Sequence, residues 1–335
     1  MKRILSAAAS FAAALLAFAG SALAQKEVTI GYQDMLVPYR VAQEAKEIEK
    51  VTGYKINWKQ FGGGGEVIKA MASGAVHIGE VGSAGIAAAV SRGEPMELFW
   101  ILDDIGSAEA LVAKNGSGIK TLADLKGKKV AMPFNSTTHF HLMVALEQAK
   151  INPADVQILN MRPPEVRAAW QRGDIHATFI WDPVLAEAKK DGTVILTSGK
   201  ISADTGKATF DGFVANRDWA KANRDFMVKF VKVLAASDDN YRRNKAKYTK
   251  DSAEAKAIAK WSGAKPEDVP ASMALYAFPS VKDQASKWLG GGKDSMAAKA
   301  LSATADFQLS QKQIEKKLPD YAVAVNPSYV QDAMK

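Results

Sequence analysis

Residues 66–90, "EVIKAMASGAVHIGEVGSAGIAAAV", carry a pattern that returns at residues 165–189 as "EVRAAWQRGDIHATFIWDPVLAEAK". Aligned without gaps, both stretches begin with Glu-Val and place a histidine three residues after a glycine, directly behind a β-branched residue. In each stretch, a helix from the glutamate to the glycine is predicted to precede a short strand, a loop and a second helix. The strands are expected to begin at Val76–Ile78 and Ile175–Ala177. The chain therefore contains two copies of one unit.

The parallel extends upstream of both stretches. "VTIGYQDMLVPYRVAQEA" (28–45) and "KVAMPFNSTTHFHLMVALEQA" (129–149) each predict a strand, a loop and a helix. Alternating strands and helices are typical of parallel sheets covered by helices. Duplication of one α/β lobe explains the shared order of elements better than chance similarity does.

Two further segments, "GSAEALVAKN" (106–115) and "TFDGFVANRDW" (209–219), flank the second copy and read as strands that cross between lobes. We expect a discontinuous first lobe made of residues 25–112 and 214–335, the latter including a helical C-terminal region. The second lobe is expected at residues 113–213. Two domains are also the default for a chain of this length.

The N-terminal residues 1–24 have the features of a secretory signal peptide: Lys2 and Arg3, an apolar run, and a small-residue end at Ala24. The chain has no cysteine, so a large hydrophobic core rather than disulfides must stabilise the exported protein. We expect a soluble periplasmic protein that acts as a monomer.

The net charge of +8, from 44 basic and 36 acidic residues, is spread along the chain without a basic stripe. This distribution argues against a nucleic-acid partner. In open α/β sheets, ligands bind beyond the carboxyl ends of the strands. Four such places are Gln33-Asp34, Gly82-Ser83, Asn135–Thr138 and Trp181-Asp182, which two facing lobes would bring to one cleft.

Six segments resemble the taurine-binding branch of the nitrate, sulfonate and taurine solute-binding family of ABC importers. They are "VTIGYQ", "ASGAVHIGEVGSAG", "GSAEALV", "STTHFHLMVAL", "RPPEVRAAWQRGDI" and "FDGFVANRDW". The resemblance runs from about Val28 to Trp219. It implies a type II periplasmic-binding-protein fold, in which each of two α/β lobes has a mostly parallel sheet flanked by helices. It also implies a bound small sulfonate, no cofactor, and an inner-membrane permease and ATPase as partners.

Ser136, Thr137 and Thr138 place three hydroxyls at the positive end of a predicted helix. One hydroxyl suffices to cap a helix, whereas three beside free amides suit an oxyanion. The resemblance implies a sulfonate here, with plain capping as the alternative. Gly82 and Ser83 match the corresponding loop of the first lobe, although Ala84 stands where the family commonly has a second serine.

Glu109 and Asp211 lie on the two crossing strands, and the resemblance implies that they hold a ligand ammonium group. A structural ion pair is the alternative for each. Trp181 offers an apolar wall or a ring face for a cation. Asp182 is expected either to cap a helix before Pro183 or to add a carboxylate to the cleft, and the Gln33 amide could reach the ligand.

The glycine run of "FGGGGEVIKAM" (61–71) lacks both the dinucleotide and the Walker patterns. It is interpreted as a turn near the cleft, with an anion nest as the alternative. His77 and His176 are repeat mates, and His139 and His141 point to different faces of one helix, so no metal site is expected.

The sequence thus predicts a binding protein with no catalytic residues. Taurine is the first candidate ligand, followed by plain alkanesulfonates and other small anions. An enzyme on the same fold, or a subunit that only senses its ligand, are the alternatives from other classes.

Overall fold

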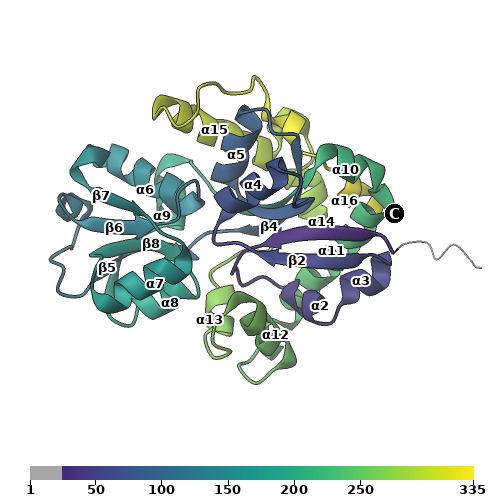
Figure 1. Ribbon diagram of the computed structural model, residues 1–335, viewed down its shortest axis with the longest axis horizontal. Helices are drawn as coiled ribbons and strands as arrows, with labels where there is room; N and C mark the ends of the chain where they lie inside the picture. The colour runs from purple at the N-terminus through teal and green to yellow at the C-terminus, as the bar shows by residue number, and fades with distance from the viewer. Residues whose placement is uncertain (1–24) are drawn as a thin grey trace, which may run out of the picture.

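The computed structural model describes residues 25–335, so the expected signal peptide at residues 1–24 lies outside the described residues. The chain folds into two lobes that lie side by side (Figure 1). Within residues 25–335, every helix is too short or too polar to cross a bilayer.

Each lobe is built on one five-stranded sheet. The first sheet has the order β2-β1-β3-β10-β4, and the second has the order β7-β6-β8-β5-β9. The strands are β1 (Glu27–Tyr32), β2 (Lys55–Gln60), β3 (Ile78–Gly82), β4 (Met96–Asp104), β5 (Glu109–Lys114), β6 (Lys129–Met132), β7 (Gln157–Asn160), β8 (Ala177–Trp181), β9 (Gly192–Thr197) and β10 (Phe210–Asn216). In each sheet, only the fourth strand of the order, β10 or β5, runs antiparallel to its neighbours. The expected pair of mostly parallel sheets is confirmed.

The two sheets correspond strand by strand, and the histidine repeat mates show it at atomic detail. The Nδ1 atom of His77 accepts a hydrogen bond from the backbone N–H of Thr29 at 3.1 Å. In the second lobe, Nδ1 of His176 accepts from the N–H of Lys129 at 3.0 Å. Each histidine therefore joins the start of one strand to its neighbour at the same place in the repeat, as expected for two copies of one unit.

Helices cover both faces of each sheet (Figure 1). In the second lobe, Leu111 and Ala113 of β5 pack in one hydrophobic cluster with α6, whereas Ala110 and Val112 pack in another with α7 and α8. This alternation is the two-residue period of a strand buried on both faces. The helices are α2 (Arg40–Glu44), α3 (Glu47–Thr52), α4 (Gly64–Ala72), α5 (Ser83–Ser91), α6 (Thr137–Gln148), α7 (Pro163–Arg172), α8 (Val184–Ala188), α9 (Ser198–Thr205), α10 (Arg217–Ala222), α11 (Arg224–Asn244), α12 (Ala253–Ser262), α13 (Val269–Met273), α14 (Val281–Asp283), α15 (Met296–Ser310) and α16 (Ser328–Ala333).

The chain crosses between the sheets twice. All of β5 belongs to the second sheet and all of β10 to the first, so boundaries at 112/113 and 213/214 would cut through these strands. We propose that the crossings are the short connections 105–108 and 206–209. The first lobe then comprises 25–104 and 210–335.

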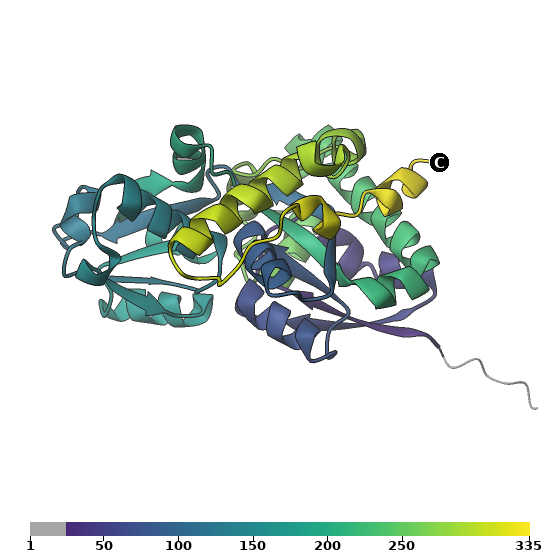
Figure 2. The same ribbon diagram turned by 90° about the horizontal axis from the view of Figure 1, so that it is seen from above.

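The C-terminal region reaches both lobes. Figure 2 shows α15 lying across the top of the molecule, from the first lobe towards the second. Its Gln308 donates from Nε2 to the carbonyl oxygen of Ala84 in α5 at 2.9 Å. One residue earlier, the Phe307 ring packs edge-on against Phe140 of α6, with the ring centroids 5.3 Å apart. A single helix of the first lobe thus contributes to the core of the second.

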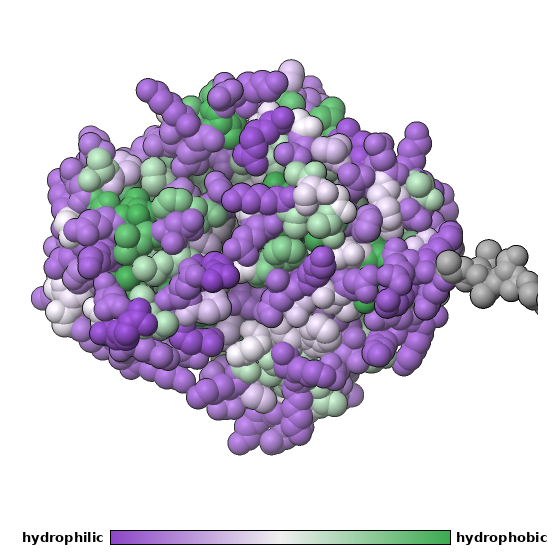
Figure 3. Space-filling view, in the orientation of Figure 1, coloured by the Kyte–Doolittle hydropathy of each residue, from purple (hydrophilic) through white to green (hydrophobic). Residues whose placement is uncertain are grey.

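The outer surface offers little sign of a further apolar interface. The face in Figure 3 is largely hydrophilic, with small hydrophobic areas between the polar ones. The exposed large apolar side chains are scattered along the described chain: Val51, Val194, Met296, Val323 and Met334. The cleft between the lobes is therefore the place to look for a binding site.

Candidate functional site

The strand ends of both lobes meet in a nearly closed cavity. It encloses about 20 Å³, the space of roughly one water molecule, which is too small for an organic ligand in this arrangement of the lobes. Its lining comes from both lobes and from the C-terminal region: Gln33, Met35, Gly64, Gly82, Glu109, Asn135, Ser136, Thr137, Trp181, Asp211 and Tyr276.

The structure brings together most of the residues expected at the site. The lining includes Gln33, Gly82, Glu109, Ser136, Thr137, Trp181 and Asp211. Three expected residues, Ser83, Thr138 and Asp182, are buried behind this lining instead.

The start of α6 presents donors to the cavity. Ser136 is the N-cap: its Oγ accepts from the N–H of His139 at 3.2 Å and donates to the carbonyl of Pro133 at 2.6 Å. Thr138 lies 2.8 Å from the same oxygen, Oγ1 to Oγ. Within residues 25–335, no acceptor pairs with the backbone N–H groups of Thr137 and Thr138. Capping therefore uses Ser136, while two amides at the positive helix end stay available for an anion.

Thr137 connects this helix start to a carboxylate. Its hydroxyl donates to Oε1 of Glu109, and the hydroxyl of Ser198 donates to Oε2 at 2.8 Å. Burial raises the pKa of Glu109 to about 7, although both hydrogen bonds act in the opposite direction. Glu109 thus changes its charge near neutral pH.

Asp211 stands opposite, on the first lobe. Burial raises the pKa of Asp211 well above its usual value, and the charges of Glu109 and Glu80 add to the rise. Glu109 pairs in register with Trp181, and Asp211 pairs with Gly82. Since β5 and β10 hold the same place in the two sheets, both carboxylates occupy equivalent positions of the repeat. Within residues 25–335, no ion pair includes Glu109 or Asp211, and Glu109 instead accepts hydrogen bonds from Thr137 and Ser198.

Gly82 lets the lobes touch. A Cβ atom at this position would lie 2.9 Å from Cγ2 of Thr137 and 3.0 Å from Oδ1 of Asp211, closer than a side chain tolerates. The glycine thus allows residues of both lobes to close over the same space.

Trp181 forms a hydrogen bond across the cleft. Its Nε1 donates to Oδ1 of Asp34, at the end of β1, at 2.8 Å. Desolvation raises the pKa of Asp34 to about 6, and this hydrogen bond opposes the rise. The indole forms part of the cavity wall, as expected, and also joins the lobes.

Gln33 is held by Glu80, a buried residue that the sequence did not single out. The Nε2 atom of Gln33 donates to the backbone carbonyl of Glu80 at 2.9 Å. Glu80 in turn pairs with the fully buried Arg40 at 3.0 Å. Arg40 also donates to the backbone carbonyl of Gln33 at 2.7 Å. The arginine therefore stabilises the loop after β1 and is not among the cavity residues.

Two of the three residues outside the lining have hydrogen-bond partners elsewhere. Ser83 Oγ accepts from the N–H of Phe210 at 3.3 Å, and Thr138 bonds Ser136. Burial raises the pKa of Asp182. The helix after it, α8, starts behind Pro183 without a side-chain cap, and Oδ1 of Asp182 has no hydrogen-bond partner within residues 25–335, so the expected capping role of Asp182 is not observed.

Two more residues were missed by the sequence reasoning. Tyr276, between α13 and the following loop, lines the cavity, and burial raises its pKa well above the usual value, with nearby carboxylates adding to the rise. Asp103, at the end of β4, is fully buried beside Asp211. Asp103 carried the signal of an acidic residue at a strand end, whereas nothing near Tyr276 pointed to the cleft.

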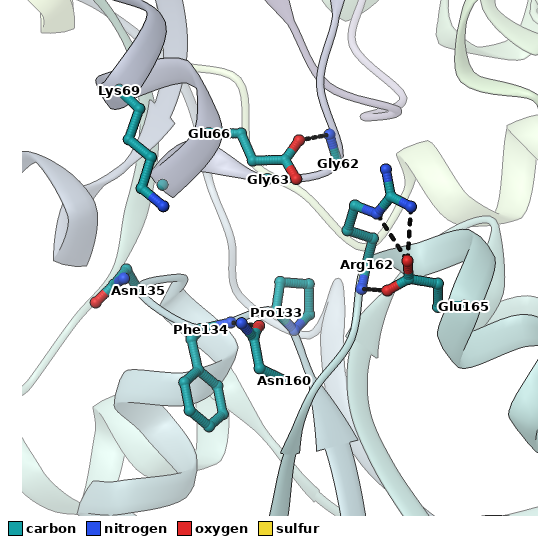
Figure 4. Close-up of a pocket in the computed structure, with 11 residues that line it drawn as sticks. Gly62, Gly63, Glu66, Lys69, Pro133, Phe134, Asn135, Asn160, Arg162 and Glu165 are labelled. Atoms are coloured by element: carbon teal, nitrogen blue, oxygen red, sulfur yellow. Dashed lines mark hydrogen bonds and ion pairs between the residues drawn. The ribbon is translucent and has the colours of Figure 1, made fainter. Parts of the chain in front are cut away.

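A wider pocket of about 280 Å³ opens outside the cavity. Figure 4 shows Gly62, Gly63 and α4 of the first lobe facing Pro133–Asn135 and Arg162 of the second. Asn135 lines both the pocket and the cavity, so the two spaces adjoin at this residue. A Cβ on Gly62 would lie 2.8 Å from Cγ of Arg162. The glycine run is therefore the turn near the cleft that the sequence predicted.

The histidines of α6 have structural contacts. The ring of His139 stacks on Phe134, with centroids 4.5 Å apart, and Nε2 of His141 lies 2.9 Å from the carbonyl oxygen of Lys207. Within residues 25–335, no three metal-ligating side chains gather at one place.

Comparison with known proteins agrees with this geometry. Residues 50–244 match the family described as NMT1/THI5 like. The chain is 33% identical, over 96% of its length and 97% of the relative's, to the taurine-binding periplasmic protein of Escherichia coli K12. This chain belongs to that family of periplasmic solute-binding proteins. The family resemblance found in the sequence motifs is thereby confirmed. This relative is a binding protein and not an enzyme.

Other relatives bind or are named for sulfonates. A putative aliphatic sulfonates-binding protein of E. coli K12 is 30% identical over 71% of this chain and 74% of its own. Among solved structures, the alkanesulfonate-binding protein of Xanthomonas axonopodis pv. citri, bound to MOPS, superposes with a TM-score of 0.69. That match has 23% identity and covers 86% of this chain and 94% of the other. The structural match confirms the two-lobed periplasmic-binding-protein fold.

Proposed function

We propose that this protein binds taurine, or a closely related small aminosulfonate, between its lobes in the periplasm. It acts as a monomer and delivers the ligand to the permease and ATPase of an ABC importer. The observation that supports the proposal is that hydrogen-bond donors and carboxylates lie around one cavity. Free amide donors at the start of α6 and the carboxylates Glu109 and Asp211 belong to residues around the same cavity.

The donors suit a sulfonate because that group has three acceptor oxygens and no proton to donate. The lining includes no Lys or Arg side chain among the described residues, so the donors for the anion are the free backbone amides at the start of α6. The carboxylates suit an ammonium group, which also offsets the repulsion between them. A zwitterion with both groups on a short linker satisfies both ends at once.

Binding is coupled to closure. Thr137 belongs to the second lobe and Asp211 to the first, and both come within 3.0 Å of the position of a Cβ on Gly82. A ligand between them contacts both lobes only when the lobes are closed, so it shifts the population towards the closed form. The closed form is the one that a permease recognises.

Thermal unfolding with a matched ligand set tests the proposal. Taurine carries both groups, ethanesulfonate only the anion, ethylamine only the cation, and β-alanine a carboxylate in place of the sulfonate. Taurine at about a hundred times Kd should stabilise the protein by ~2.7 kcal/mol, or roughly 5–10 °C in Tm. Nitrate and sulfate serve as other small anions.

A variant then assigns the ammonium end. Asp211→Asn should weaken taurine binding by about tenfold to a hundredfold, because a charge-assisted contact is worth ~1.5–3 kcal/mol, and should leave ethanesulfonate binding nearly unchanged. Asp238→Asn, which neutralises a buried aspartate of α11 outside the cavity, is the matched control.

A plain alkanesulfonate is the second candidate, favoured by the second-lobe donors and by the aliphatic sulfonates-binding relative. Equal shifts with taurine and ethanesulfonate would select it and would remove the ammonium role of Glu109 and Asp211. No shift with any sulfonate would refute the ligand class.

A further inference from the structure

A buried carboxyl group without a partner stands directly behind the cavity. Asp103 of β4 is the register partner of Asp211 of β10 in an antiparallel pair. Its side chain is fully buried, and neither carboxylate oxygen has a hydrogen-bond partner within residues 25–335. Asp211 lines the cavity, and Asp103 does not. Any effect of Asp103 on a ligand therefore acts through Asp211.

The charges that raise the pKa of Asp103 all come from acidic groups: Asp211 on β10, Asp104 next to it on β4, Glu109 on β5 and Glu80 on β3. Asp103 in turn raises the pKa of Tyr276, from the C-terminal region. The buried cation of this region, Arg40, is already paired with Glu80 at 3.0 Å. Burial raises the pKa of Asp103 well above its usual value, and the charge of Asp211 is the next largest cause.

Two carboxylates that face each other on neighbouring strands repel. Here both are buried, where an uncompensated charge is costly. One of the two carboxyl groups must therefore hold a proton as long as no cation is bound beside them. An unpartnered carboxyl group beside a ligand cavity thus indicates a ligand that brings positive charge.

We propose that Asp103 is a positioning residue, that the Asp103 and Asp211 pair holds one proton on one of its two carboxyl groups while the site is empty, and that a ligand ammonium group binding at Asp211 releases this proton to solvent. The proton leaves the carboxyl pair for the buffer, and the pair then faces the cation as carboxylates. The ammonium group keeps its own protons. This inference rests on the proposed function, since it requires a cationic ligand group at Asp211.

Isothermal titration of the mature protein with taurine in several buffers tests the inference. The slope of the observed enthalpy against the ionisation enthalpy of the buffer gives the number of protons released. At about pH 8, where Glu109 with its pKa of about 7 is already mostly ionised, the wild-type protein should release about one proton per taurine, and none with ethanesulfonate.

Asp103→Asn should still bind taurine, but its proton release should fall to half of the wild-type value or less. The affinity of this variant should also decline less than that of the wild type as the pH is lowered. Asn at this site removes an unpaired buried charge, so the variant is expected to fold. Asp238→Asn is the matched control, because Asp238 is another buried aspartate with an unpartnered oxygen, and its proton release should equal that of the wild type.

Tight taurine binding by the wild type without proton release would overturn the inference and leave the proposed function standing. Release by Asp103→Asn equal to that of the wild type would also overturn it. Absence of binding by taurine and every other sulfonate would instead refute the proposed function. The wild-type measurement needs no variant, so a failure of Asp103→Asn to fold leaves the inference open to refutation.

Discussion

The loops after β1 and β6 hold the same place in the two lobes but have different chemistry. After β1, a longer loop leads to α2, whose first residue, Arg40, is buried and tied to Glu80 and to the backbone of Gln33. After β6, the chain enters α6 at Thr137 behind the cap Ser136, with helix amides facing the cavity. One copy of the repeat uses its helix start for internal stability, and the other keeps it for a ligand.

Unlike the helix starts, the carboxylates are present in both copies of the repeat. Glu109 and Asp211 occupy equivalent register positions beside Trp181 and Gly82. The repeat thus supplies a symmetric pair of acidic groups, whereas the proposed anion-binding helix start belongs to α6, and its counterpart, α2, begins with the buried Arg40. A ligand with one cationic and one anionic end fits this combination of symmetry and asymmetry.

The largest expected effect comes from a substitution in α15 that removes a contact of the first lobe with the core of the second. Phe307→Ala removes a ring from α15 that packs in the second-lobe core against Phe140. We expect a loss of about 3–5 kcal/mol in the free energy of unfolding, measured by urea denaturation. Amide exchange in α6 should accelerate more than in α3.

The exposed Val323 of the same C-terminal region is the matched control, since Val323→Ala should change stability by less than ~0.5 kcal/mol. Equal losses of amide protection in both lobes would show that α15 does not serve the second lobe in particular.

The next effect concerns the charge of Glu109. Its usual pKa of 4.5 rises to about 7 in the folded protein, so the folded state holds more protons between these values. The stability that protonated Glu109 contributes is therefore fully present below about pH 4.5 and is lost as the pH rises through about 7. Glu109→Gln should raise the free energy of unfolding by ~3 kcal/mol at about pH 8 and by almost nothing at about pH 4.

Thermal unfolding across this pH range measures the difference, and saturating taurine should remove it. Glu165→Gln is the control, because the exposed Glu165 pairs with Arg162 and its pKa is lowered. A stability gain from Glu109→Gln that is the same at all pH values would contradict the assignment.

A smaller effect tests the contact between the lobes. Gly82→Ala places a methyl group 2.9 Å from Cγ2 of Thr137 and 3.0 Å from Oδ1 of Asp211. Ligand affinity should fall by about tenfold to a hundredfold, because overpacking costs ~1–3 kcal/mol and opposes closure. Titration calorimetry gives the affinity, and circular dichroism should show an unchanged fold.

Gly65→Ala is the matched control at the same cleft, since its nearest neighbours would be 3.6–3.7 Å away. Equal losses from both alanine substitutions would mean that Gly82 has no special part in closure.

The smallest effect concerns the hydrogen bond across the cleft. Trp181→Phe keeps an aromatic wall and removes the donor to Asp34. Taurine affinity should fall by roughly threefold to tenfold, as expected for the loss of ~1 kcal/mol. Trp170→Phe removes a similar bond to Asp191 away from the cavity and should leave the affinity unchanged. An unchanged affinity for Trp181→Phe would show that this bond does not favour the closed form.

Much of the fold was predictable because it depends on local and periodic signals. Gly74 and Gly173, which end the two equivalent helices, both have positive φ. Together with the paired histidines, these glycines indicated the repeated unit in the sequence. The parallel-sheet rule then placed the four strand ends together. The positions of side chains were less predictable: the Ser83 hydroxyl accepts from the backbone N–H of Phe210 and is not part of the cavity lining.

The sequence by itself determined the repeat, the two sheets and the polar groups at the strand ends, because spacing along the chain is enough to specify strands, helices and their caps. Only the tertiary structure decided that Thr137 donates to Glu109, that Asp103 lies unpartnered beside Asp211, and that Tyr276 and Phe307 reach the cleft and the second lobe. These contacts join residues far apart in the chain, and their formation depends on how complete lobes pack rather than on any local pattern.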